Sequence, residues 1–133
     1  IMDKIKIVAP NMRYISQDLG QLEFYDDKPP VSWPLSLIDI GEATFEEYLH
    51  NLQTVNVNVT IRIAHCTYSD VSNLPNTQVR ELALTFYELE HAIGNALHNW
   101  TPPHDELGAL TRISTSTEKR DDNIRVRVLT FNV

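Results

Sequence analysis

The sequence has few of the residues from which several common sites are built. It contains four glycines and one cysteine in 133 residues, and 18 acidic side chains against 11 basic ones leave a formal charge of −7. With so few glycines, a phosphate-cradling loop has little to be made from. A single cysteine, Cys66, cannot form an internal disulfide, and a reducing compartment fits it best. The acidic balance argues against a surface that grips nucleic-acid phosphates.

Long apolar runs and targeting patterns are missing as well. No apolar stretch approaches the ~20 residues that a membrane helix needs, and no secretory signal is present, so a soluble protein is expected. The length fits a single domain, residues 1–133, with one core. Because Ile1 precedes Met2, we expect either that an upstream segment is missing or that the first residue is a cloning remnant.

The strongest pattern is an alternation between Thr54 and Cys66. Branched apolar residues take every second position, with polar residues between them, namely Val55, Val57, Val59, Ile61 and Ile63 against Asn56, Asn58, Thr60 and Arg62. This pattern predicts a strand with one dry and one wet face, at the centre of a mostly antiparallel sheet. The wet face is either solvated surface or the lining of an assembly.

A second pattern predicts a long helix after this strand. Apolar residues recur three and four positions apart, and two prolines then close the helix: Val79, Leu82, Phe86, Leu89, Ile93, Leu97 and Trp100, followed by Pro102 and Pro103. A shorter helix is expected between Ile1 and Ala9, where Pro10 stops it. Both helices should pack on the sheet.

The remaining strands are shorter or less certain. We expect strands at Met12–Ile15, at Leu35–Ile40 with Gly41 ending it, and in a hairpin of Leu110–Thr117 and Ile124–Phe131. In the last run the apolar parity changes after Val128, so either the buried face switches or both faces are covered. The predicted fold is α+β, a mixed, mostly antiparallel sheet with a long helix and a shorter N-terminal helix packed on it.

Two segments between these elements are apolar enough to lie at an interface. Residues Asp26–Pro34 carry three prolines around Trp33, which predicts a stiff surface arm with an exposed indole. Residues Glu42–Gln53 fit a helical stripe or a hairpin arm leading into the central strand, and either way Glu42, Glu46 and Glu47 are exposed.

The sequence shows no pattern for catalysis or for a bound metal or cofactor. Five histidines are present, but His91 and His98 are seven residues apart, whereas a helical zinc pair needs a spacing of four. The paired carboxylates lie in polar stretches where water keeps both members ionised. We therefore predict no catalytic, cofactor-binding or metal-binding residues.

The connection Glu118–Asp122 mixes both signs of charge. Its residues Lys119, Arg120, Asp121 and Asp122 lie beside Arg112, Arg125 and Arg127 in sequence. They form either a solvated hairpin tip or a patch where opposite charges set the pairing of subunits.

Several of these stretches resemble a known family. They are Asp18–Leu22, Tyr25–Asp26 with Pro29, Pro30, Val31 and Pro34, Leu110–Arg112 and Thr117–Asp122. They resemble a family of small prophage proteins from Bacteroidetes-type genomes, and the order of elements is similar to the tail-terminator proteins of lambda-like long-tailed phages. The resemblance implies helices on one face of a curved mixed sheet and a hexameric ring.

In that family the ring caps the tail tube and joins it to the head, and DNA passes through the lumen without sequence-specific binding. The resemblance implies a non-enzymatic virion protein of the tail, assembled in the bacterial cytoplasm. Its partners are other copies of itself, the tail tube protein and a head-completion protein. Such proteins usually begin with a complete helix, whereas only the last turns are expected here.

The residues suggest where such a ring would have its surfaces. We expect one side of the subunit interface at Trp33, Phe45 and Tyr48, the other at Arg112, Lys119, Arg120, Asp121 and Asp122, and an acidic lumen at Glu42, Glu46 and Glu47. The alternatives are another head-tail joining or tail-associated virion protein, a small ligand-binding or peptide-binding module that uses the cleft between helix and sheet, and a hydrolase with an unrecognised site.

Overall fold

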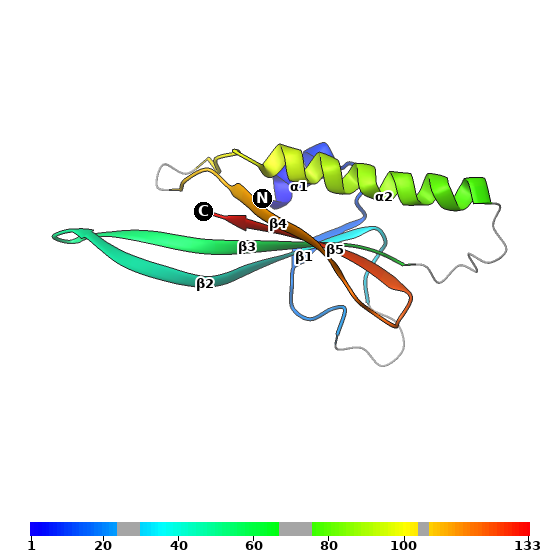
Figure 1. Ribbon diagram of the computed structural model, residues 1–133, viewed down its shortest axis with the longest axis horizontal. Coiled ribbons are helices and arrows are strands. Elements are labelled where there is room, and N and C mark those ends of the chain that lie inside the picture. The colour runs from blue at the N-terminus through cyan, green and yellow to red at the C-terminus, as the bar shows by residue number, and fades with distance from the viewer. Residues whose placement is uncertain (24–29, 67–75, 104–106) are drawn as a thin grey trace.

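The computed structural model describes residues 1–23, 30–66, 76–103 and 107–133, which form a mixed sheet with both helices on one face (Figure 1). The sheet has five strands in the order β1-β2-β3-β5-β4, in which only β1 and β2 are parallel, so the predicted α+β class is confirmed. Within these residues no helix is long and apolar enough to cross a membrane. The elements are α1 (Met2–Val8), β1 (Tyr14–Gln17), β2 (Leu35–Leu49), β3 (Leu52–Cys66), α2 (Asn76–Leu97), β4 (Thr111–Glu118) and β5 (Ile124–Asn132).

Strand β3 occupies the centre of the sheet, as its alternation predicted. It pairs with β2 on one side and β5 on the other. Its residues Val59, Ile61 and Ile63 are buried in the main core, together with Ile93 and Leu97 of α2. This core exists because a strand with one apolar face can bury it only against another layer, which the helices supply.

The opposite face of the sheet has a smaller core of its own. Leu35 and Leu37 of β2 are buried there with Leu22, which precedes the sheet's long strands. Strand β5 serves both cores, since Ile124 and Val126 belong to this one and Leu129 and Phe131 to the main one. Coverage of both faces therefore accounts for the change of parity along β5.

The indole of Trp33 is half-buried against this smaller core, so the expectation of an exposed indole is wrong. An indole has a large apolar area, and the buried face of β2 that begins at Leu35 gives it a surface to cover. The earlier part of the predicted proline arm, residues 26–29, lies outside the described residues.

Strand β2 continues through Gly41, which was expected to end it, as far as Leu49. The register with β3 slips between Ile40 and Ala43, so a bulge lies at Gly41. A Cβ atom on Gly41 would lie 3.2 Å from the carbonyl oxygen of Asn58, so the glycine allows a close backbone approach. Of the two alternatives for residues 42–53, the hairpin is confirmed.

Candidate functional site

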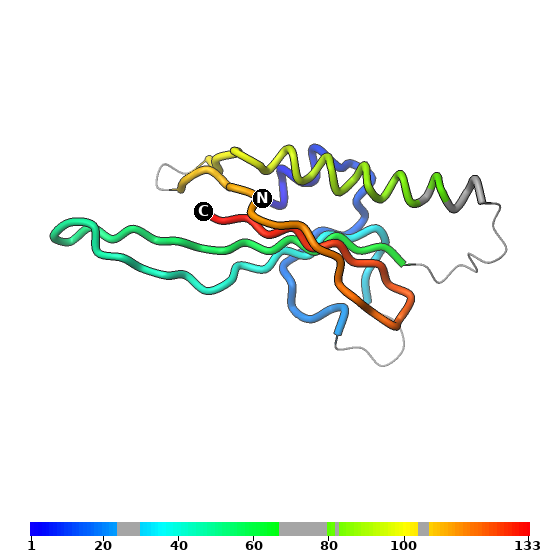
Figure 2. Tube along the Cα trace, viewed as in Figure 1, coloured from blue at the N-terminus to red at the C-terminus, as the bar shows by residue number. Residues whose placement is uncertain are grey.

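Strands β2 and β3 extend beyond the rest of the sheet as a two-stranded hairpin, residues 42–56, which we call the arm (Figures 1 and 2). The short strand β1 pairs with β2 only as far as Ile38. Strand β5 pairs with β3 as far as Asn58, and Val133 just after it exchanges two backbone hydrogen bonds with Val57. Within the described part of the chain, no strand flanks the arm on either side. The turn closes between Leu49 and Leu52, where Asn51 adopts a positive φ of 67°.

One face of the arm is apolar and uncovered. Phe45 faces Val55 across the two strands, and Ala43 faces Val57. Because β3 keeps its alternation from Val55 to Ile61, these residues lie on the face that the helices cover elsewhere. The side chain of Phe45 is nevertheless 61% exposed. We call Ile40, Ala43, Phe45, Val55 and Val57 the apolar strip.

The bulge at Gly41 makes this strip continuous. Ile40 and Phe45 are five residues apart, so in a regular strand they would lie on opposite faces. The extra residue in β2 restores Phe45 to the face of Ile40, which pairs with Val59. The side chains of the apolar strip are therefore gathered on one surface.

The predicted glutamates of the arm do not share one face. Glu46 pairs with Thr54 on the polar face, whereas its neighbour Glu47 pairs with Gln53 and lies on the face of the apolar strip. Glu42 lies in the bulge, and all three are exposed. The tip adds exposed apolar residues, with Tyr48 at 73%, Leu49 at 60% and Leu52 at 58%.

The predicted charged tip between β4 and β5 is partly engaged within the chain. Arg120 pairs with Asp122 at 2.6 Å and with Glu118 at 2.7 Å, and it also donates to the carbonyl oxygen of Leu22. The hydrogen bond that Arg120 donates to Asp122 is the largest cause that raises the pKa of Arg120 above its ordinary value. Lys119 and Asp121 remain exposed at the tip.

Arg62 forms a cluster that sequence reasoning missed. Its guanidinium pairs with Asp18 at 2.9 Å, Glu23 at 2.5 Å and Glu118 at 2.8 Å. Burial acts to lower the pKa of Arg62, but these hydrogen bonds raise it above its ordinary value. Since Asp18 and Glu23 precede the long strands, the cluster fastens residues 18–23 to the sheet.

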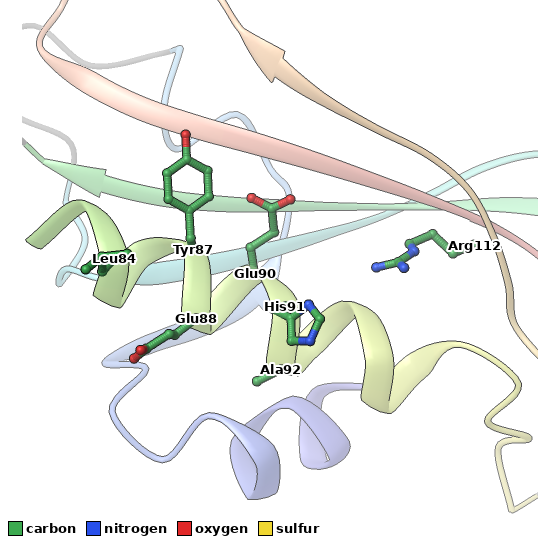
Figure 3. Close-up of a pocket in the computed structure, with 7 residues that line it drawn as sticks. All are labelled: Leu84, Tyr87, Glu88, Glu90, His91, Ala92 and Arg112. Atoms are coloured by element: carbon green, nitrogen blue, oxygen red, sulfur yellow. The ribbon is translucent and has the colours of Figure 1, made fainter. Parts of the chain in front are cut away.

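Arg112 lies away from this cluster, in a hollow of about 470 Å³ on the other side of the sheet. The hollow lies between β4 and α2, and Figure 3 shows Glu90 and His91 on the side of the helix toward Arg112, with Glu88 pointing away. We call it the α2 hollow, and it is lined by Leu84, Tyr87, Glu88, Glu90, His91, Ala92 and Arg112.

The histidines of the described residues do not come together. His50 lies at the exposed arm tip, and His65 packs on Phe86 with ring centroids 5.6 Å apart. His91 bonds to Asn95, and Nδ1 of His98 accepts from the backbone N–H of Arg112. Among the described residues, no three His, Cys, Asp or Glu side chains are grouped so that they could hold a metal ion. His104 lies outside the described residues.

No protein-family model matches the sequence, and no curated protein matches it significantly.

Proposed function

We propose that this protein is a structural subunit of a phage or prophage tail, a tail-terminator ring that caps the tail tube and joins it to the head. The arm is the observation that supports this proposal most. The hairpin of β2 and β3 exposes six large apolar side chains, namely Ile40, Phe45, Tyr48, Leu49, Leu52 and Val55. An exposed apolar surface of this kind is expected to be covered by another molecule.

The shape of the arm favours a ring. It projects away from the two-layered body, so its apolar strip is out of reach of most of its own sheet and helices (Figure 1). A contact between the arm of one copy and the body of the next joins two different patches, and repeated contacts of that kind close into a ring when the rotation permits. We propose six copies, by the resemblance to tail terminators.

The charge of the chain suits a ring through which DNA passes. A net charge of −7 leaves few cations to neutralise phosphates, and binding to DNA depends on such neutralisation. Of the lumen residues expected from the sequence, Glu42, Glu46 and Glu47, we propose Glu46 for the acidic lumen, with the polar face of the arm turned inward, because Glu47 lies on the opposite face with the apolar strip.

A tube-capping assay with a major tail-tube protein tests the proposal. The tube protein is polymerised alone and with increasing amounts of this chain, and tube length is measured by electron microscopy. We expect shorter tubes that end in a ring-shaped cap, at substoichiometric amounts of added protein. Unchanged tube lengths with the tube protein encoded beside this gene would contradict a terminator. Binding along the tube without arrest would favour another tail-associated virion protein.

A further inference from the structure

We propose that the arm of one copy docks in the α2 hollow of the next copy, with Glu47 of the arm paired to Arg112 of the hollow. This inference rests on the proposed ring, because it names the surface that receives the arm.

The hollow offers an apolar surface of the right kind. Leu84 and Tyr87 line it and are 60% and 53% exposed, although they belong to a helix whose other side packs on the sheet. Exposed large apolar groups gathered at a hollow mark a place that a partner covers. The apolar strip, led by Phe45 and Val55, has the same character and lacks a cover in the same chain.

Arg112 gives the α2 hollow a positive charge, whereas the arm carries carboxylates and no lysine or arginine. No carboxylate pairs with it among the described residues, whereas Arg62, Arg120 and Arg127 each have an acidic partner. Glu90, the acid on the same side of the helix, is already bound to Arg127 at 2.7 Å. A cation without a partner at the rim of an apolar hollow favours an incoming carboxylate.

The Arg112 side chain lies against the backbone of α2. The Arg112 guanidinium lies over Gly94, where an added Cβ atom would collide with Nη1. The glycine therefore lets the side chain lie across α2.

The arm carries a carboxylate at the matching place. Glu47 follows Phe45 by two residues, so both lie on one face about 7 Å apart. Within the described residues Glu47 has no cation partner. The arm thus presents apolar groups followed by a carboxylate, and the hollow presents apolar groups beside a guanidinium.

The same chain cannot make this contact. Arg112 pairs with Phe131 and Phe131 pairs with Val59, whereas Glu47 pairs with Gln53, six residues or about 20 Å further along β3. The contact therefore joins two copies, with the arm of one on the body of the other, as a closed ring requires.

Charge reversal on each side tests the pairing. Glu47→Lys and Arg112→Glu each place like charges in contact, and we expect each variant alone to self-associate about tenfold or more weakly than the wild type. An equimolar mixture of the two variants is expected to recover association to within about threefold of the wild type. The reason is that every contact in an alternating ring then joins opposite charges.

The matched control is Glu46→Lys, which makes the same change of charge on the opposite face of the arm. It is expected to leave association within about threefold of the wild type. The inference is overturned if the mixture associates no better than its separate components, or if Glu46→Lys is as harmful as Glu47→Lys. The latter result would show a general effect of charge.

One further variant separates this inference from the proposed function. Phe45→Ser removes an apolar anchor of the arm and is expected to abolish association whichever surface receives the arm. If Phe45→Ser abolishes association and Arg112→Glu does not weaken it, the ring stands and the hollow is the wrong receiver. If the wild type stays monomeric at every concentration and also with tube protein, both proposals fail.

Discussion

Arg62 links residues 18–23 to the face of the sheet opposite the helices. Its side chain is 12% exposed and pairs with Asp18, Glu23 and Glu118. Removing the guanidinium leaves Asp18 without its cation and leaves Glu23 and Glu118 with Arg120 alone, and loss of one partner from a buried pair costs about 3 kcal/mol. We expect Arg62→Ala to lower the free energy of unfolding by about that amount in urea denaturation at pH 8.

The control for this prediction is Arg125→Ala, on the neighbouring strand β5. Arg125 is exposed and has no ion pair among the described residues, so its loss should change the free energy of unfolding by no more than about 0.5 kcal/mol. Equal effects of the two variants would show that the cluster around Arg62 does not fasten residues 18–23.

His65 gives the fold a dependence on pH. It is half-buried against Phe86, and burial, together with the charge of Arg125, lowers its pKa below 6.5. The folded state therefore holds a neutral imidazole, and stability is lost as pH falls from about 6.5 through the lower folded pKa. We expect the wild type to lose more stability between pH 7 and pH 5 than His65→Gln, measured by urea denaturation at each pH. Parallel curves for the two proteins would contradict this.

The residue-scale contacts were the hardest to predict from sequence. The alternation placed Arg62 on a wet face, but its partners Asp18 and Glu118 are 44 and 56 positions away along the chain. No local pattern connects residues that far apart, because only the folded sheet brings them together. That Arg112 has no acidic partner among the described residues could be learned only in the same way.

Among the elements, the arm is the one that can be removed without touching either core. Replacing residues 45–55 by Asn-Gly joins Thr44 to Asn56, which already face each other, through a two-residue turn. The described side chains that are lost are exposed, so we expect the free energy of unfolding to change by less than about 1 kcal/mol. Urea denaturation checks this, and a collapse of the fold would show that the arm is part of the body.

A substitution at Gly94 of helix α2 tests whether the position of the Arg112 side chain matters for self-association. Gly94→Ala adds a methyl group where the guanidinium lies and 3.1 Å from Cδ2 of Leu129. Alanine favours the helix by about 1 kcal/mol, which offsets the crowding, so stability should stay within about 1 kcal/mol of the wild type. Self-association should weaken severalfold in light scattering, because Arg112 is displaced. Unchanged association would mean that the position of Arg112 does not matter.

The sequence predicted the elements better than their limits. The alternation around Ile61 was enough to place β3 at the centre of the sheet, and the α+β class followed from the order of elements. It could not decide the conformation of residues 42–53, since Phe45, Tyr48, Leu49 and Leu52 fit both periodicities. The prediction that Gly41 ends the strand is wrong, because a glycine inside a strand pattern also marks a bulge.

At the scale of the whole molecule, the described residues cover parts of both faces of β2, β3 and β5 in the body, whereas the arm and most of β4 are exposed. The helices cover one face and the segment around Leu22 and Trp33 covers the other. We therefore propose that a second molecule covers the apolar strip. The net charge of −7 makes nucleic acid a poor candidate for that molecule.

The most direct test is the molar mass of the wild type and of the arm-shortened variant, measured by light scattering across a concentration series, with and without tail-tube protein. We predict that the wild type rises from its single-chain mass of 15.3 kDa to a fixed multiple, six by our proposal, while the shortened chain remains single throughout. A wild type that stays at the single-chain mass under all of these conditions, or a shortened variant that assembles equally well, would contradict arm-mediated assembly.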